Sequence, residues 1–351
     1  MGLANPHRKN DIRLAFWLAP AAVRFPDSAR ASNRRDGRCE PILHRLPCPS
    51  DKKRPWLHYI IPVVAYSVVL VCRNHSEFIE SAIRSLLAQT LPPAKLLVID
   101  VASSDDSREK VVGYADRYPG RIEVRLLAHR NMVEVLQQTI GEIATPYVSF
   151  LSADDYFCRG RFGQQVAALE SASLSVVLCF TDVQTVGEFD KWNPRIPLAP
   201  VSGIPQVIPA AAARRSLVEK NWIVAPSVLL RTDIARPAII SLDPSMPFED
   251  YPLWLRLSRE FDFLYLPSRL TYYRQHAESA SGNSRNRRKF IAPQVLLLCR
   301  ELERNPDLAR VIFLRTFSLL KMALRNLEAK ATLHAVSVMF RAGLQTLTIR
   351  E

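Results

Sequence analysis

Acidic side chains suited to catalysis recur at three places in the middle of the chain. They are Asp100 at the end of one apolar segment, Asp154–Asp155 after another, and Glu249–Asp250 before an amphipathic segment. Paired carboxylates are suitable ligands for Mg²⁺ or Mn²⁺, which neutralise the charge on a diphosphate leaving group. A separate carboxylate, remote from the metal, can remove the proton of an attacking hydroxyl group. The pattern therefore predicts metal-assisted group transfer, with Asp250 as the base.

Each acidic site also has an ordinary structural explanation. An Asp-Asp pair after a strand is often only a turn, and Glu-Asp before a helix is often only a cap. A helix that begins at Asp250 would in addition hold this carboxylate ionised through its dipole and nearby amides. The order of the three sites along the chain, rather than any single site, favours the catalytic interpretation.

The segments around these acids alternate between strand and helix patterns. Residues 67–72 form a continuous apolar run rich in β-branched residues, and residues 77–88 repeat apolar side chains at helical spacing. Strands are expected at 96–101, 121–127, 147–151 and 174–182, and helices at 106–118, 132–143 and 160–172. This alternation predicts a mostly parallel sheet flanked by helices, with ligands bound beyond the carboxyl ends of the strands.

The second half of the chain has weaker signals. Five prolines between positions 194 and 209 indicate an irregular stretch, and we expect loops over 183–221 and 232–247. Between and after these loops, a strand-like segment is expected at 223–230, a helix at 252–260 and a short strand at 261–266. Long amphipathic helical patterns then occupy the C-terminal segment.

The positive charge of the chain is concentrated at its two ends. Among its 351 residues, Lys and Arg outnumber Asp and Glu by 13. Residues 1–60 contain 12 basic and 5 acidic residues, and residues 285–351 contain 13 basic and 5 acidic residues. The slightly acidic segment between them is unlike a groove that follows a nucleic-acid backbone, so no nucleic-acid partner is predicted. We expect a disordered basic leader over 1–62, a catalytic domain over 63–285 and a helical extension over 286–351.

Cysteine usage and hydropathy favour a cytoplasmic protein. The six cysteines show no zinc or redox spacing, which indicates reduced thiols. The most apolar run, 57–72, is too short to span a bilayer. The basic cluster at 285–289 has two interpretations: a solvated charge run, or a weak attraction of the C-terminal helices to anionic lipid at the cytoplasmic face of the membrane.

Several short motifs resemble those of the family 2 inverting glycosyltransferases. Residues 71–74 correspond to the end of an apolar strand and the P-T-Y-N motif of that family. Residues 99–107 correspond to its V-D-D-G-S-x-D-x-S motif. Its D-A-D-D motif corresponds to residues 152–155. The closest segments are 248–257, similar to E-D-Y-D-L-W-L-R-L, and 272–279, similar to Y-Y-R-x-H-x-x-S.

The resemblance implies the α/β fold called GT-A, a Rossmann-like, mostly parallel sheet flanked by helices, here with a C-terminal helical extension. It implies metal-dependent, inverting transfer of a sugar from a nucleotide-diphosphate donor to a hydroxyl of a glycan or lipid-linked acceptor, as in cell-surface polysaccharide synthesis. The catalytic base would be Asp250, and the divalent metal, Mg²⁺ or Mn²⁺, would bind Asp155 and His276. The residues that would bind the donor are Cys72, Arg73, Asn74, Asp100, Asp154 and Arg274.

The donor motifs depart from the family pattern. Only the asparagine of P-T-Y-N is retained, Val101 and Ala102 replace the second aspartate and the glycine of V-D-D-G-S, and Ser152 replaces the first acid of D-A-D-D. These departures leave two alternatives open. One is a catalytically impaired protein of the same fold that binds a nucleotide or a glycan, and the other is a membrane or nucleic-acid binder that acts through its basic ends.

Overall fold

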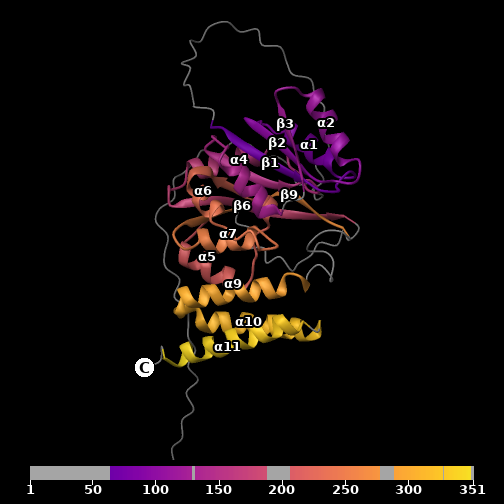
Figure 1. The fold of residues 1–351 in the computed structure, drawn as a ribbon. Helices are drawn as coiled ribbons and strands as arrows, with labels where there is room; N and C mark the ends of the chain where they lie inside the picture. The colour runs from indigo at the N-terminus through magenta and orange to yellow at the C-terminus, as the bar shows by residue number, and fades with distance from the viewer. Residues whose placement is uncertain (1–63, 129–130, 188–205, 277–287, 327, 349–351) are drawn as a thin grey trace, which may run out of the picture. The chain divides into compact units, whose positions relative to one another are not determined.

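A nine-stranded sheet forms the framework that positions the three acidic sites (Figure 1). The computed structural model describes residues 64–128, 131–187, 206–276, 288–326 and 328–348. The expected leader, residues 1–62, and positions 285 to 287 of the basic cluster lie outside the described residues.

Four parallel strands in the order β3-β2-β1-β4 form one half of the sheet. They are β1 (Tyr66–Cys72), β2 (Lys95–Val101), β3 (Ile122–Leu127) and β4 (Tyr147–Ser152). The helices of this half are α1 (Ile79–Leu87), α2 (Ser107–Arg117), α3 (Met132–Ile140) and α4 (Arg161–Glu170). The predicted parallel sheet flanked by helices is therefore confirmed, and its strand order reverses direction between β1 and β4.

The strands bury both faces of the sheet, because their side chains alternate between two cores. Val68 and Leu70 of β1 point into a core shared with α1, α2 and α4. Val69 and Val71 point into a second core, which includes α3 and the helices of the later part of the chain. Burial on both faces explains why these strands are continuous apolar runs.

Beyond β4 the sheet becomes mixed, in the order β4-β8-β6-β9-β5, with β7 paired to β9. The strands are β5 (Tyr156–Phe157), β6 (Val176–Gly187), β7 (Gln206–Ile208), β8 (Leu229–Arg231) and β9 (Asp262–Gln275). β6 and β9 run parallel up to the pair Gly187 and Gln275. Both strands extend past their predicted ends because they pair with each other, which the local apolar pattern does not show.

Two helices occupy segments that were expected to be loops, so these expectations are wrong in part. They are α5 (Ala210–Glu219) and α6 (Thr232–Ile240). Pro209 directly precedes α5, and the run of alanines that follows has high helix propensity. Pro237 lies inside α6, where a proline is normally read as a helix breaker. A short 3₁₀ helix, η1 (Ala225–Ser227), lies between them.

Helix α7 (Asp250–Leu257) precedes β9, and three helices form the C-terminal extension, as predicted. These three are α9 (Ile291–Arg304), α10 (Ala309–Arg325) and α11 (Ala329–Thr348), with the 3₁₀ helix η2 (Pro306–Leu308) before α10. They belong to the same compact unit as the sheet. Glu301 of α9 is fully buried and forms an ion pair with Arg259, which follows α7.

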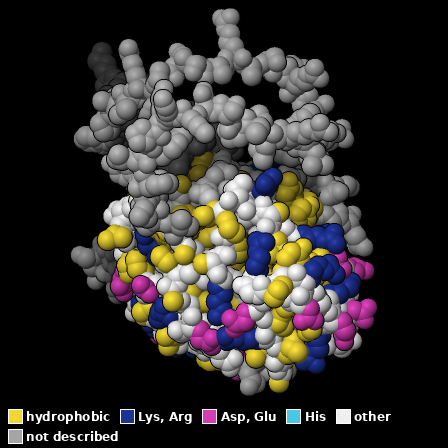
Figure 2. Space-filling model, turned by 90° about the horizontal axis from the view of Figure 1, so that it is seen from above, with side chains coloured by type: hydrophobic (Ala, Val, Ile, Leu, Met, Phe, Trp, Pro, Cys, Tyr) yellow, Lys and Arg dark blue, Asp and Glu magenta, His cyan; other side chains and the backbone are white. Residues whose placement is uncertain are grey.

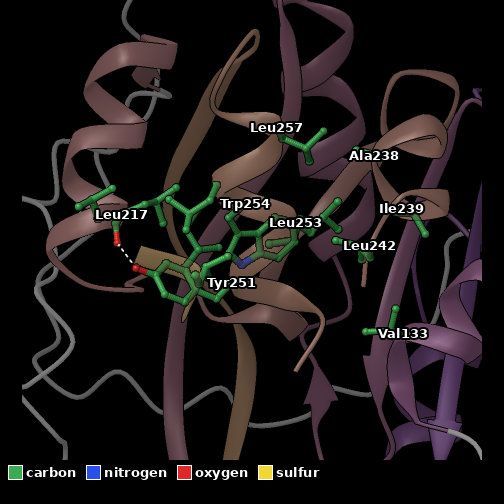
Figure 3. Packing of buried hydrophobic residues seen from close by; sticks show 14 of the residues in the cluster. Val133, Leu217, Ala238, Ile239, Leu242, Tyr251, Leu253, Trp254 and Leu257 are labelled. Carbon is green, nitrogen blue, oxygen red and sulfur yellow. Dashed lines mark hydrogen bonds between the residues drawn. The ribbon is translucent and has the colours of Figure 1, made fainter. Parts of the chain in front are cut away.

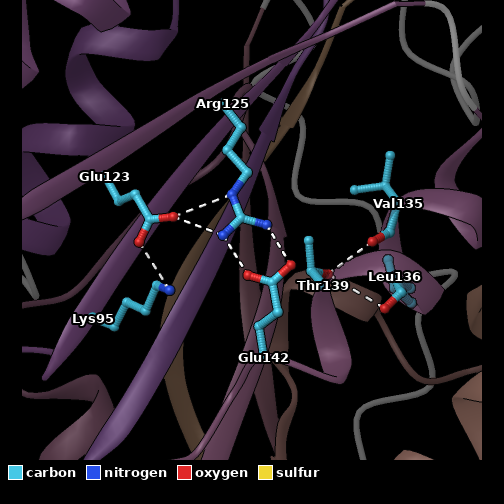
Figure 4. A network of polar contacts seen from close by, with 7 residues as sticks. All are labelled: Lys95, Glu123, Arg125, Val135, Leu136, Thr139 and Glu142. Atoms are coloured by element: carbon cyan, nitrogen blue, oxygen red, sulfur yellow. Dashed lines mark hydrogen bonds and ion pairs between the residues drawn. The ribbon is translucent and has the colours of Figure 1, made fainter.

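Charged residues cover the outer edge of the parallel half. Arg125 of β3 contacts Glu123 and also Glu142, which follows α3, while Lys95 lies 2.8 Å from Glu123 (Figure 4). Charges on an edge strand oppose pairing with another chain. On the face seen in Figure 2, basic and acidic side chains are interspersed among apolar and neutral ones.

None of the helices in the described part of the chain is both long and apolar enough to cross a membrane. The four cysteines within this part are free thiols. The other two, Cys39 and Cys48, lie outside the described residues.

Candidate active site

The reversal of strand order places the loops after β1 and β4 side by side. Val71, near the end of β1, pairs with Ser152 at the end of β4. His75 lies just beyond β1, and Asp154 just beyond β4. In sheets of this type, the crevice at such a reversal is the usual place of ligand binding.

His75, Asp154 and His276 form a cluster that could hold a metal ion. One ligand atom from each residue lies within 4.8 Å of the others. Nε2 of His276 is 3.3 Å from Oδ2 of Asp154. His276 reaches this position because it directly follows β9, whose Tyr272 pairs with Tyr156 just after Asp154.

The electrostatics of the cluster suit a cation. Burial lowers the pKa of His75, so its imidazole is neutral, which is the form that binds metals. Burial by itself would raise the pKa of Asp154, but its hydrogen bonds, first the one with His276, and the neighbouring His75 ring outweigh burial and lower the pKa. Asp154 Oδ1 and His75 Nδ1 are buried without a hydrogen-bond partner among the described residues.

Asp155, predicted as a metal ligand, lies outside this cluster and is almost fully buried. Its Oδ1 accepts a hydrogen bond of 2.8 Å from the backbone N–H of Arg274. Burial, and then the charge of Asp154, raises its pKa well above the usual range. Arg274 Nε in turn donates to the carbonyl of Asp154 (2.8 Å), and its guanidinium lies 4.6 Å from the ring centre of Phe78. Asp155 thus supports the loop that carries Asp154.

The residues predicted to bind the nucleotide lie at the carboxyl ends of β1 and β2. Asp100 is fully buried, and its Oδ1 accepts from the backbone N–H of Ser103 at 3.3 Å, whereas Oδ2 has no partner among the described residues. Arg73 and Asn74 are exposed. Cys72 lies entirely within the core, and burial raises the pKa of its thiol to about 11. The structure therefore offers an exposed surface at Arg73 and Asn74 but not at the buried side chains of Cys72 and Asp100.

The loops after β1 and β2 are held together by an unusual backbone. Asn74 and Ala102 have φ angles of 54° and 51°, in the left-handed region. The Ser104 N–H donates to Oδ1 of Asn74 at 2.8 Å, and the Asn74 N–H donates to Oγ of Ser103 at 3.0 Å. Asparagine tolerates a positive φ, but alanine is strained there.

A single cavity of about 580 Å³ joins the Asp154 region to Asp250. Its lining includes Asp154, Asp155, Lys220, Asn221, Glu249, Asp250 and Arg315. The structure thus brings together two of the three acidic sites, which are far apart in the sequence. Asp100 does not line this cavity.

Helix α7 holds Asp250 at its first position. Leu253, Trp254 and Leu257 bury the inner side of the helix (Figure 3). The hydroxyl of Tyr251 donates to the carbonyl of Leu217 in α5 at 2.8 Å (Figure 3). These contacts leave the Asp250 carboxylate directed toward Asn221, which lies beyond the end of α5. Nδ2 of Asn221 donates a hydrogen bond of 2.9 Å to Oδ2 of Asp250.

The expectation that the helix N-terminus keeps Asp250 fully ionised needs correction. Withdrawal from water raises the pKa of Asp250, and the hydrogen bonds from Asn221 and the Tyr251 amide offset this only in part. Burial and the adjacent Asp250 raise the pKa of Glu249 to about 8. The two carboxyl groups titrate as a pair. Because its pKa is raised, the ionised Asp250 carboxylate is a stronger base than an exposed one.

Four residues at these sites were not identified from the sequence. His75 follows Asn74 just beyond the end of β1. The search for polar residues near the carboxyl ends of strands, which located the acids, could therefore have found His75 too. Asn221 was assigned to a loop, and no motif marks it. Gln294 and Arg315 line the cavity from the C-terminal helices, and no sequence signal connects them with Asp250.

Comparison with known proteins identifies the domain. Residues 67–226 match the model of the family described as glycosyl transferase family 2. These residues form a family 2 glycosyltransferase domain. The resemblance to the family 2 glycosyltransferases that the motifs suggested is therefore confirmed. Asp250 and His276 lie beyond the matched residues.

Individual relatives of this glycosyltransferase domain are distant. An uncharacterized protein of Mycobacterium tuberculosis is 27% identical over 64% of this chain and 63% of its own length. The chain therefore spans less than two thirds of that relative. The UDP-Glc:α-D-GlcNAc-diphosphoundecaprenol β-1,3-glucosyltransferase WfgD of Escherichia coli is 24% identical, over 55% of this chain and 70% of its own.

A solved structure confirms the fold class. The structure of S. aureus TarS 1–349 in complex with UDP-GlcNAc matches with a TM-score of 0.56 and 15% identity. The match covers 79% of this chain and 81% of that chain. The glycosyltransferase domain therefore has the predicted GT-A fold.

The strained alanine of the β2 loop gives a first prediction. Ala102→Gly should raise the free energy of unfolding by roughly 1 kcal/mol, because glycine adopts a positive φ without steric cost. Ala88→Gly is the matched control: Ala88 is also exposed but has a φ of −88°. That substitution should leave the stability unchanged or lower it. Urea unfolding measures both variants, and equal effects would contradict the strain at Ala102.

The half-buried acid pair Glu249 and Asp250 gives a second prediction. The folded state holds the Glu249 proton up to about pH 8, whereas the unfolded chain releases it near the ordinary pKa of 4.5. The free energy of unfolding should therefore decrease as pH rises from about 5 to 8. Glu249→Gln should flatten this decrease. Urea unfolding at several pH values tests it, and an unchanged slope in the variant would show that Glu249 is not the responsible group.

Proposed function

We propose that the protein is a metal-dependent glycosyltransferase that moves a sugar from a nucleotide-diphosphate donor to an acceptor hydroxyl, with inversion at the anomeric carbon. One observation carries the proposal. A single cavity contains Asp154, a member of a cation-binding cluster, and Asp250, a carboxyl group with a raised pKa on a separate element. Metal-dependent, inverting sugar transfer requires these two functions in one site.

The donor would bind beyond the ends of β1, β2 and β4. The exposed residues Arg73 and Asn74 offer contacts for the base and ribose. Arg274 stands beside Asp154, where its charge would attract the diphosphate. TarS was crystallised with UDP-GlcNAc, and the name of WfgD specifies UDP-Glc, which supports a nucleotide-sugar donor here.

The cluster of His75, Asp154 and His276 would hold the divalent metal. Its unpartnered atoms and its combination of two imidazoles with one carboxylate fit a cation. Imidazole ligands suit Mn²⁺ better than Mg²⁺, which prefers oxygen. When bound, the metal would neutralise the charge on the departing nucleoside diphosphate.

Asp250 would act as the general base. It would accept the proton of the acceptor hydroxyl as the oxygen bonds to the anomeric carbon and the bond to the diphosphate oxygen breaks. Asn221 fixes the orientation of the carboxylate through Oδ2. The raised pKa makes Asp250 a stronger base than an exposed aspartate. A base separate from the leaving-group site is consistent with a single displacement, and hence with inversion.

A nucleotide- or glycan-binding protein without turnover is the alternative, favoured by the altered donor motifs. The structure weakens one argument for it, because Ala102 keeps a positive φ at the position where the family pattern has glycine. Screening nucleotide sugars for metal-dependent hydrolysis and for thermal stabilisation separates the two functions. Stabilisation without hydrolysis or transfer would favour the alternative.

The setting of the reaction is also a proposal. Nucleotide sugars are cytoplasmic metabolites, so we place the protein in the cytoplasm, with a weak attraction of its basic C-terminal helices to anionic lipid. The acceptor is either a glycan or a lipid-linked sugar. The boundaries 1–62, 63–285 and 286–351 remain proposed domain limits.

Asp250→Asn tests the assignment of the base. The amide cannot accept the proton, so kcat should fall by about 10²–10⁴-fold while nucleotide-diphosphate binding with Mn²⁺ stays nearly intact. Transfer assays and calorimetry measure the two effects. Asp243→Asn is a control on a surface carboxylate paired with Arg300. Unchanged turnover in Asp250→Asn would refute the role of Asp250.

Asp154→Asn tests the metal site. Loss of the central carboxylate should weaken Mn²⁺ binding by about 100-fold or more. His75→Gln and His276→Gln should each weaken it as well, whereas Asp100→Asn should not. Calorimetric titration with Mn²⁺ in the absence of nucleotide gives the affinities directly. Wild-type affinity in Asp154→Asn and both histidine variants would exclude this cluster as the metal site.

A further inference from the structure

The aromatic ring of Phe78, directly before α1, lies among the charged and imidazole groups of the candidate site. Its centre is 4.9 Å from the ring centre of His276 and 6.3 Å from that of His75. The guanidinium carbon of Arg274 lies 4.6 Å from the same ring centre. One phenylalanine therefore adjoins two residues of the metal-binding cluster and the arginine beside it.

Ordinary packing does not account for this phenylalanine. Among the described residues, those that form the two hydrophobic cores or pack against them do not include Phe78, and its side chain is half-buried. Its ring interactions within the described part of the chain are with His75, His276 and Arg274. An apolar side chain that serves no core indicates a role at the site that it contacts.

The imidazole of His276 requires support from side chains. β9 ends at Gln275, which forms the last pair with Gly187 of β6, so the strand ladder does not include His276. Nε2 of His276 lies 3.3 Å from Oδ2 of Asp154, which fixes one atom of the ring. The ring of Phe78, inclined at 42° to the imidazole, restricts the rotation of its plane. Contacts that orient a histidine in this way increase its affinity for a metal.

The backbone fixes Phe78 relative to the second histidine. The N–H groups of Phe78 and Ile79 both donate to the carbonyl of His75 at 2.9 Å. The N–H of His75 donates to Oγ of Ser107, the first residue of α2, also at 2.9 Å. The turn from His75 to Phe78 is thus held against a neighbouring helix, which keeps the phenylalanine ring beside both imidazoles.

Arg274 occupies another part of the same ring system. Its guanidinium lies over the Phe78 ring, as expected for a cation attracted to an aromatic face. Its Nε donates to the carbonyl of Asp154 at 2.8 Å. Phe78 is therefore in contact with both the group that would bind the cation and the group that would attract the diphosphate.

We propose that Phe78 is a positioning residue of the metal site. Its ring holds the imidazole of His276 in the orientation that binds a divalent cation, and it holds the Arg274 guanidinium beside that cation. The inference rests on the proposed function and specifies what orders its metal site. Phe78 acts through His276 and Arg274 and does not itself bind the metal.

Calorimetric titration with Mn²⁺ in the absence of nucleotide tests this role. Phe78→Leu keeps an apolar side chain but removes the aromatic ring, so the affinity for Mn²⁺ should fall by about tenfold or more. Phe78→Tyr keeps the ring and should bind Mn²⁺ as the wild type does. Phe317→Leu is the matched control, because Phe317 of α10 also has a cation over its ring, Lys321 at 4.3 Å, but lies outside the metal cluster. It should leave the affinity unchanged.

Co²⁺ in place of Mn²⁺ gives a readout that a merely structural role would not change. The visible absorption of bound Co²⁺ depends on the geometry of its ligands, so Phe78→Leu should alter the spectrum at saturation and Phe78→Tyr should restore it. Thermal unfolding without metal should be nearly the same in Phe78→Leu and in Phe78→Met as in the wild type, because Phe78 lies outside both cores. Loss of the fold in both variants would make Phe78 a structural residue and overturn the proposal.

The outcomes separate this inference from the proposed function. Wild-type Mn²⁺ affinity and an unchanged Co²⁺ spectrum in Phe78→Leu, with Mn²⁺ binding lost in Asp154→Asn, would overturn the role of Phe78 and leave the metal site standing. Mn²⁺ binding that is absent from the wild type, or retained in Asp154→Asn and both histidine variants, would refute the metal site and the role of Phe78 together. Transfer activity that persists in Asp250→Asn would refute the base and leave the result for Phe78 unchanged.

Discussion

The candidate site depends on the neighbouring positions of β1 and β4 in the sheet. Because β2 and β3 follow on one side of β1 while β4 lies on the other, the loops after β1 and β4 meet at the carboxyl edge. His75 and Asp154 are therefore brought together by strand order alone. The long β9 strand then adds His276 from more than a hundred residues further along the chain, so the cluster combines three separate segments.

The two sets of carboxyl groups that share the cavity differ in pKa because their neighbours differ, although burial raises the pKa of each. Asp154 lies beside two imidazoles, and their contacts keep its pKa low despite burial. Glu249 and Asp250 lie beside each other without a cationic partner of comparable effect, so burial raises the pKa of both. Carboxyl groups whose surroundings separate their pKa values are suited to different roles. The arrangement combines Asp154, a member of the cation-binding cluster with a lowered pKa, with Glu249 and Asp250, whose pKa values are raised.

The sequence predicted the strongly patterned parts of this architecture. Alternating strands and helices between 67 and 172 are local signals, and so is the segment around Asp250. The lengths of β6 and β9 depend on their mutual pairing, and α5 and α6 form in segments that contain or follow prolines, so local patterns missed them. Asn221 and Arg315 become part of the cavity only through packing between helices, which no spacing in the sequence records.

The C-terminal helices complete a cavity that the sheet leaves open. Arg315 of α10 reaches the Asp250 cavity because α10 packs on α5, and α5 is tied to α7 by the hydrogen bond between Tyr251 and Leu217. The residues matched by the family model, 67–226, contain Asp154 but neither Asp250 nor Arg315. His75 and Asp154 of the proposed metal cluster therefore lie within the matched residues, whereas Arg274 and His276, like Asp250, come from the part of the chain that follows. The complete site therefore depends on the packing of both parts of the chain, because β8 pairs with β4 and β9 brings His276 to Asp154.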